Sequence, residues 1–364
     1  MFVGITNTPR DYAWGSDGAI SGLLGFEASG APEAELWLGA HPGSPSRVVG
    51  STDTLLDVVD GRLPFLLKVL AAGSPLSLQA HPTMAQAEEG FARENALGIP
   101  LDAPNRNYKD AFHKPELIYA LSDEFDALCG FRSADATWSM LESTLGAAAA
   151  TMLERIDGDE SLRPVFEWLI TRGDGVDALV DAVSAAADAS SPELATVALL
   201  AEHYPGDPGI VISLMLNRVT LKAGEALYLP AGNIHAYLSG LGIELMASSD
   251  NVLRGGLTPK HIDISQLLSV LDFRPLPVPY LVPESPSAGV RVFRPLGADF
   301  ALLVVEADTT QALTGPAIAL CLDGDFVLAG VMSQAALHRG ESIYIADEQS
   351  LEITGRGRLV LATV

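Results

Sequence analysis

The sequence predicts a mainly β protein with one helical region, and three features of its 364 residues support this class. Short apolar runs broken by glycine and proline fill the first part of the chain, as is typical of strands. Between about residues 133 and 204 the composition changes to alanine, leucine, aspartate and glutamate at helical spacing. Short strand-like runs then return and continue to the C-terminus. The helices are therefore expected as an insertion between β regions.

The first β region is expected over residues 1–132, with runs such as Glu35 to Ala40 and Leu63 to Ala71 forming strands. One helix is expected to interrupt it. Thr83 is a suitable N-cap for a stretch with apolar residues at helical spacing, and Gly98 predicts where that stretch ends.

The helical region is expected over residues 133–206. Ser191 followed by Pro192 and Glu193 is typical of a capped helix start with proline in the first turn. Strands are expected to resume from Ile210 to Leu221 and to continue to about residue 275. The first β unit would then consist of 1–132 and 207–275.

A second β unit is expected at the C-terminal end of the chain. The proline-rich stretch from Pro275 to Pro286 is predicted to be a linker. Residues 288–364 again form short strand-like runs, such as Phe300 to Glu306 and Ala317 to Leu322. Their spacing is typical of a small sandwich or jelly roll.

The charge composition narrows the class of ligand. With 22 lysines and arginines against 46 aspartates and glutamates, the formal net charge is −24. This disfavours binding to nucleic acid or to an anionic membrane surface, both of which attract basic proteins. The chain has only five lysines, and four of them lie within the motifs described below. A site for an anionic small molecule would have to concentrate this scarce positive charge.

The cysteines and the N-terminus indicate the compartment. Cys129 and Cys321 lie far apart in sequence, so neither a disulfide framework nor a thiolate metal site is predicted. The N-terminus lacks a basic segment followed by an apolar core, and no run of about 18 apolar residues occurs. We therefore expect a cytoplasmic protein. We also expect a monomer, and its expected partner is a small molecule.

The first motif that could form a functional site is the segment from Gly73 to Pro82, which contains Gln79 and His81. Two residues apart on a strand, these side chains project from the same face. An amide oxygen beside an imidazole can begin a metal site. The alternative is a polar patch held together by hydrogen bonds.

Two further segments supply matching ligand types. One segment begins at Gly224, continues after five intervening residues through Pro230 and ends at His235, and its spacing resembles the second histidine motif of cupin jelly rolls. The Gly73 segment resembles the first cupin motif, with glutamine in place of one histidine. Glu116 stands at the start of an apolar run, where a carboxylate is costly to bury unless it is paired or bound to metal. Gln79, His81, Glu116 and His235 together suit zinc or another divalent first-row metal.

A polar loop from Glu244 to Lys260 carries two cations, Arg254 and Lys260, with glycines that allow a ligand to approach the backbone. One interpretation is an anion-binding loop. The alternative is a surface loop held by an ion pair between Asp250 and Arg254. Four histidines without a spacing partner are expected at the surface or in hydrogen bonds: His41, His203, His261 and His338.

Five segments in this order resemble the type I mannose-6-phosphate isomerases: LPFLLKVL, LSLQAHP, NYKDAFHKPEL, YLPAGNIHAYLSG and GIELMASSDNVLRGGLTPKHID. The resemblance implies tandem cupin-like jelly rolls plus an α-helical insertion, with one zinc ion per chain held by Gln79, His81, Glu116 and His235. It also implies a catalytic role for Arg254 and site roles for Lys114 and Lys260. Ala346 and Asp347 stand where a metal-binding cupin would place a histidine, so no second metal is expected in the C-terminal unit.

The implied reaction interconverts mannose 6-phosphate and fructose 6-phosphate by moving a proton between C2 and C1 through an enediol. Candidates for the proton transfer are Lys114, Glu244, Tyr237 and His81. Arg254 is better suited to stabilising an oxyanion, because a guanidinium stays protonated. The remaining residues expected to contact the substrate are Lys260, Lys68, Ser77, Tyr237, Glu244 and Asp250.

Some of these assignments have structural alternatives. Tyr237 and Ser77 can instead satisfy backbone groups at the barrel rim, and Trp14 either lines the pocket or packs in the core. Two other functions also fit the motifs. A cupin oxygenase would use iron with a similar ligand set, and a non-catalytic protein would bind the sugar phosphate without turnover.

Overall fold

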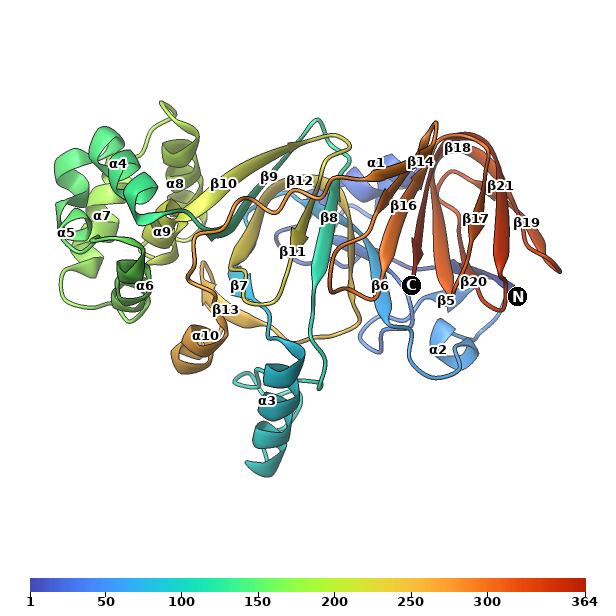
Figure 1. Ribbon diagram of the computed structural model, residues 1–364, viewed down its shortest axis with the longest axis horizontal. Helices are drawn as coiled ribbons and strands as arrows, with labels where there is room; N and C mark the ends of the chain where they lie inside the picture. Colours follow the sequence, from blue (N-terminus) through green and yellow to red (C-terminus); the bar gives the residue numbers. More distant parts are fainter.

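The computed structural model describes all 364 residues and shows an elongated molecule of three parts (Figure 1). The helices of the insertion lie at one end, a sheet built mainly from the C-terminal chain lies at the other, and a second sheet lies between them. The predicted class, mainly β with a helical region, is confirmed. No helix combines the length and the apolar character that a membrane crossing requires.

The central sheet has nine strands and surrounds the candidate site. Its path runs β10-β9-β12-β6-β4, while β7, β8, β11 and β13 pair off this path. The strands are β4 (Glu35–Leu38), β6 (Phe65–Ala72), β7 (Leu78–Ala80), β8 (Glu116–Ala120), β9 (Glu124–Phe131), β10 (Leu216–Lys222), β11 (Ala226–Leu229), β12 (His235–Ala247) and β13 (Leu253–Gly256).

Strand β6 shows how the sequence separates the site from the core. All eight of its residues are buried, so both faces are covered. Leu67 and Val69 belong to the core between the two sheets, whereas Leu66, Lys68 and Leu70 line the pocket on the other face. The period of two along a strand therefore places a lysine at the pocket from within an apolar run.

Strand β12 reaches the site at both of its ends because of a β-bulge. Its first half pairs with β7 and β9, and its second half pairs with β6 and β8. The register shifts between Tyr237 and Ser239, and Gly240 has φ 122°. An extra residue changes which face the following side chains occupy. Consequently Tyr237, before the bulge, and Glu244 and Met246, after it, all line one pocket.

Short elements connect these strands: β2 (Ser16–Asp17), β3 (Pro32–Glu33), α1 (Ala19–Leu24), α2 (Leu55–Val58), α3 (Met84–Ala96) and α10 (Ile264–Val270). The predicted cap of α3 is confirmed, since the Thr83 hydroxyl accepts a hydrogen bond from the Gln86 backbone N–H. Gly98 follows the helix with φ 70°, a conformation that glycine adopts without strain, and so ends it as predicted.

The insertion consists of α4 (Ala134–Thr144), α5 (Ala150–Leu153), α6 (Leu162–Ile170), α7 (Val176–Ala186), α8 (Pro192–His203) and α9 (Gly209–Ile212), with 3-10 turns at Gly146–Ala149, Asp159–Ser161 and Ser213–Met215. Ser191 caps α8 as predicted. The prediction of a strand from Ile210 was wrong over its first half. Residues 210–215 are helical and buried in the core of the insertion, and the strand begins at Leu216. A short fully apolar run does not distinguish a buried helix from a strand.

The C-terminal sheet has ten strands. Eight come from the predicted unit or its border, namely β14 (Glu284–Ser287), β15 (Val290–Phe293), β16 (Ala301–Val305), β17 (Thr309–Ala312), β18 (Ala317–Ala329), β19 (Gln334–His338), β20 (Ser342–Ile345) and β21 (Ser350–Thr363). The other two are N-terminal, β1 (Phe2–Thr6) and β5 (Arg47–Val48), because β1 pairs with both β20 and β5.

The two sheets share a core. Along β16, Leu302 and Val304 join the cluster that includes Leu67 of β6, whereas Leu303 and Val305 belong to the separate core of the C-terminal unit. A strand covered on both faces explains the unbroken apolar run that begins at Phe300. We propose that the chain divides at the predicted bounds, except that β1 and β5 belong with the C-terminal unit.

Both cysteines are free and buried, in agreement with the expectation of no disulfide. Burial raises the pKa of the Cys129 thiol to about 12, so this group stays protonated at neutral pH. Cys129 lies opposite His235 in the pairing of β9 with β12, where it packs as a small apolar side chain.

Candidate active site

A pocket of about 540 Å³ opens on the central sheet. This size lies within the usual range for small-molecule sites. Of the twelve residues predicted for the site, ten line it: Lys68, Ser77, Gln79, Lys114, Glu116, Tyr237, Glu244, Asp250, Arg254 and Lys260. The other two, His81 and His235, are buried next to Glu116. The structure thus brings all twelve together from five different segments of the chain.

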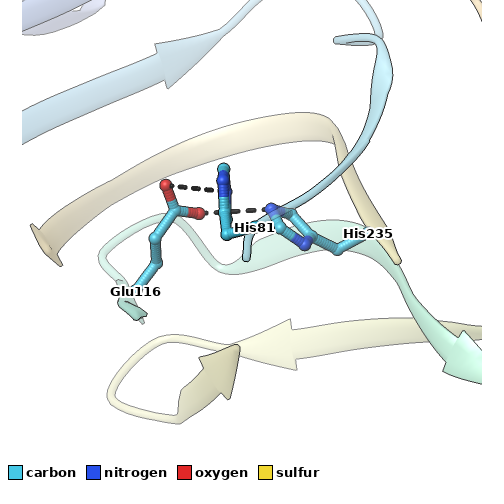
Figure 2. A group of neighbouring side chains, drawn as sticks. All are labelled: His81, Glu116 and His235. Carbon is cyan, nitrogen blue, oxygen red and sulfur yellow. Dashed lines mark ion pairs between the residues drawn. The ribbon is translucent and has the colours of Figure 1, made fainter. Parts of the chain in front are cut away.

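Three potential metal ligands meet at this place (Figure 2). Nε2 of His81 lies 3.3 Å from Oε1 of Glu116, and Nε2 of His235 lies 3.2 Å from Oε2 of the same carboxylate. His81 follows β7, Glu116 begins β8 and His235 begins β12. Pairing of neighbouring strands therefore converts three distant motifs into one cluster.

Backbone carbonyls determine which nitrogen of each histidine faces the cluster. Nδ1 of His81 is 2.8 Å from the carbonyl oxygen of Asn251, and Nδ1 of His235 is 3.0 Å from that of Asn233. A carbonyl only accepts hydrogen bonds, so both Nδ1 atoms must carry the hydrogen. In the neutral tautomers, each Nε2 then directs a lone pair toward Glu116, which is the arrangement found in metal-ligating histidines.

The residues fit a divalent cation. Two imidazole lone pairs that face a carboxylate repel it unless positive charge lies between them. Burial lowers the pKa of His81 to about 4, so this imidazole is neutral at neutral pH and does not supply that charge itself. Nε2 of His81 and Oε2 of Glu116 are also buried without any hydrogen-bond partner. The donor set of nitrogen and oxygen without thiolate suits zinc.

Gln79 lies beside this cluster. Its Nε2 atom is 3.3 Å from Nε2 of His235, and it pairs with His235 across β7 and β12. The oxygen and nitrogen of a side-chain amide are interchangeable by a flip about the last torsion. A flip would present the amide oxygen to a cation bound by the other three residues.

Lys114 contacts the same carboxylate from the pocket side. Its Nζ is 3.1 Å from Oε1 of Glu116, and the lysine side chain is largely buried. Burial raises the pKa of Glu116, but its neighbours, among them the Lys114 ammonium, outweigh this effect and hold the pKa well below its ordinary value. Glu116 is therefore ionised and available as a ligand.

A second buried charge cluster surrounds Lys68. Its Nζ lies 2.8 Å from Oε2 of Glu244 and 3.2 Å from Oε1 of Glu35. Burial lowers the pKa of Lys68, yet the two carboxylates raise it overall. Burial raises the pKa of Glu244, and Lys68 only partly offsets this. One ammonium shared by two carboxylates leaves Glu244 easier to protonate than an ordinary glutamate.

Three cations line the pocket: Arg254, Lys260 and Lys109. No carboxylate pairs with any of them. Burial lowers the pKa of Arg254, and burial together with Arg254 and Lys109 lowers the pKa of Lys260. The alternative ion pair between Asp250 and Arg254 is absent, because Asp250 contacts His41 instead. In a chain of net charge −24, three unpaired cations form an anion-binding environment.

The remaining predicted residues have distinct surroundings. The Tyr237 hydroxyl is fully buried without a hydrogen-bond partner, and burial raises its pKa well above the ordinary value. The Tyr237 hydroxyl therefore does not form a hydrogen bond with a backbone group, which was the alternative to a contact with the substrate. Ser77 lies in the lining of the pocket, as does Trp14, which stacks on Tyr12 with ring centroids 5.8 Å apart.

Several pocket residues were missed by sequence reasoning. Lys109 could have been found, because it is one of only five lysines and lies in the same segment as Lys114. Glu35 and Trp37 belong to a strand that reads as ordinary core, and Tyr204 comes from the end of α8 in the insertion. No sequence signal indicates that these three meet at the pocket.

Comparison with known proteins identifies the family of the chain. Residues 2–134 match the family described as phosphomannose isomerase type I, catalytic domain. The mannose-6-phosphate isomerase of Escherichia coli strain K12 is 40% identical over 383 residues, covering 98% of this chain and 97% of the relative. The mannose-6-phosphate isomerase of Homo sapiens is 32% identical over 406 residues, covering 94% and 93%.

Solved structures agree with the sequence relatives. A crystal structure of mannose 6-phosphate isomerase bound with zinc and yttrium has a TM-score of 0.90 at 38% identity and covers 100% of this chain and 99% of its own. A zinc-bound holo form of mannose 6-phosphate isomerase also gives a TM-score of 0.90 at 38% identity. The predicted fold class is confirmed, and these relatives favour neither the oxygenase nor the non-catalytic alternative. The chain belongs to the type I phosphomannose isomerase family.

Proposed function

We propose that this protein is an aldose–ketose isomerase that interconverts mannose 6-phosphate and fructose 6-phosphate. The observation that carries the proposal is one pocket that combines a buried metal donor set with unpaired cations in its lining. A metal held by the donor set suits the carbonyl and hydroxyl oxygens of a sugar, and the unpaired cations suit a phosphate. A sugar phosphate is the ligand class that needs both.

The proposed cofactor is one zinc ion per chain, held by Gln79, His81, Glu116 and His235. When bound, zinc supplies a Lewis acid that polarises oxygen atoms of the substrate. The protein itself prepares the place for it. The carbonyl groups of Asn251 and Asn233 orient the two histidines, and the strand pairing of β7, β8 and β12 brings the donors together.

The proposed phosphate anchor comprises Lys260, with Lys109 beside it. Replacing Lys260 by alanine should raise KM for mannose 6-phosphate about tenfold, because a charge-assisted hydrogen bond contributes about 1.5–3 kcal/mol. The turnover number should change little, since phosphate binding is equal in ground and transition states. Steady-state kinetics measure both quantities, and exposed Lys222, which pairs with Glu124 far from the pocket, provides the control K222A.

The reaction moves one proton from C2 of the aldose to C1, and one between the two sugar oxygens. We propose that Lys114 exchanges the proton at oxygen, since its Nζ stands next to Glu116 at the base of the pocket. Glu244 has a raised pKa and a pocket position suited to hold the carbon-bound proton between the two steps. Arg254 opposes the negative charge that develops on the enediolate oxygen. Ser77, Tyr237, Asp250 and Lys68 complete the proposed contacts.

Replacing Lys114 by methionine should lower kcat by about 10²-fold, the usual loss when a general acid–base group is removed. KM should change much less, because the phosphate anchor remains. Zinc content measured by atomic absorption should stay at one ion per chain. A K114M protein with unchanged kcat would exclude Lys114 from proton transfer, whereas lost zinc would reveal a role in holding Glu116.

The assignment is tested by incubating the zinc-loaded protein with mannose 6-phosphate and identifying the product. Fructose 6-phosphate should form at the same rate with and without oxygen. Oxygen consumption would indicate the oxygenase alternative, and tight binding of the sugar phosphate without any product would indicate the non-catalytic one.

We further propose that the protein acts as a monomer in the cytoplasm. All proposed ligand and substrate residues come from one chain, so a single copy is sufficient for the site. The two free, buried cysteines suit a reducing compartment.

A further inference from the structure

His41 lies beside the pocket, in the loop that follows β4, and nothing in its sequence surroundings marks it as functional. It is only 5% exposed. Its Nδ1 accepts a hydrogen bond of 3.1 Å from the backbone N–H of Gly43, so Nε2 must carry the hydrogen of the neutral ring. The Trp37 ring packs edge-on against it, with centroids 5.0 Å apart at 89°. The orientation of the imidazole is therefore fixed from two sides.

The fixed Nε2 atom points to Asp250. It lies 3.3 Å from Oδ1 of that carboxylate, whose side chain is 44% exposed and lines the pocket. The backbone N–H of Asp250 donates to Oδ2 of Asp110, which anchors the main chain. The Asp250 carboxylate makes no hydrogen bond or ion pair with any protein group other than His41. Oδ2 therefore has no hydrogen-bond partner in the protein.

The neighbouring cations give this contact its importance. Burial raises the pKa of Asp250, but His41, Lys114 and Lys109 together hold it below its ordinary value. Asp250 is thus ionised close to two ammonium groups. Without His41, the carboxylate would be drawn to Lys109, which has no ion-pair partner, and pairing would neutralise a charge that the substrate needs.

We propose that His41 is a positioning residue that holds the Asp250 carboxylate apart from the lysines and directs its free oxygen at a hydroxyl group of the sugar. This inference rests on the proposed function. The ligand group must be a neutral donor such as a hydroxyl, since a carboxylate accepts hydrogen bonds and repels the phosphate. His41 would thereby link the loop after β4 to recognition of the sugar portion of the substrate.

The test compares H41L, which removes the donor, with H41Q, which keeps an N–H near the position of Nε2. H41L should raise KM for mannose 6-phosphate about tenfold, the effect of one hydrogen bond to a charged group, while kcat stays within about threefold. H41Q should recover most of this loss. D250N should raise KM by a similar factor. The double variant H41L/D250N should have nearly the same KM as D250N, because the two residues act through one contact.

Calorimetry separates this inference from the proposed function. H41L should weaken binding of mannose 6-phosphate to the zinc-loaded protein but leave binding of inorganic phosphate unchanged, even if the wild-type protein had no turnover. Equal losses for both probes, or an H41L effect of the same size in the D250N background, would overturn the proposal. If H41L fails to fold by circular dichroism, H41Q and D250N provide the same comparison between the two probes.

Discussion

Replacing Glu116 by glutamine should abolish measurable isomerisation and reduce bound zinc to well below one ion per chain. The substitution keeps the shape of the side chain but removes the one negative charge among the four proposed ligands. Lewis-acid assistance contributes several kcal/mol to such a reaction, so its loss corresponds to at least about a 10³-fold decrease in kcat. The measurements are zinc content by atomic absorption and kcat by a coupled assay.

A matched control for this prediction is E124Q. Glu124 lies on β9, the next strand along the chain, but its side chain is exposed and pairs with Lys222 at the surface. This variant should keep its zinc and full activity. An E116Q protein that retained one zinc ion and wild-type kcat would show that the cluster of His81, Glu116 and His235 is not the metal centre.

Replacing Arg254 by alanine should lower kcat/KM by about 10²–10³-fold. This is the typical loss when one oxyanion-stabilising group is removed. The guanidinium has no carboxylate partner in the protein, so its removal leaves no unpaired buried anion behind. The fold should therefore remain stable, and the loss should be confined to catalysis.

Two further variants sharpen the Arg254 prediction. R254K keeps the charge but lacks the planar fork of donors, and it should recover only part of the lost activity. R274A removes an exposed arginine that pairs with Asp272 and should behave as wild type. Wild-type kcat in R254A would limit Arg254 to binding the phosphate or exclude it from the site.

The residues predicted for the site do meet in one place, whereas part of the chain path was predicted wrongly. Gln79, His81, Glu116 and His235 were identifiable as candidate ligands because metal ligands require particular side chains at particular strand positions, and each lies in a recognisable motif. Arg254 and Lys260 were identifiable because cations are scarce in this acidic chain. Such signals are local in the sequence, so they can be recognised without knowing which strands pair.

Features that depend on distant pairing could not be predicted. β1 joins the C-terminal sheet through β20, a contact that no local pattern at Phe2–Thr6 indicates. The bulge in β12 places both Tyr237 and Glu244 at the pocket, whereas a regular strand would separate residues of odd and even number. His41 reaches the site only through its contact with Asp250, which lies far along the chain. Glu35 does so through Lys68, 33 residues away on another strand.

The zinc dependence of the isomerase is tested by titrating the metal-free protein with zinc while the conversion of mannose 6-phosphate to fructose 6-phosphate is followed. Turnover should be absent without metal, rise in proportion to added zinc, and stop rising at one equivalent per chain. Full turnover in the metal-free protein, or no turnover at any zinc level from a folded protein, would contradict a zinc-dependent isomerase centred on His81, Glu116 and His235.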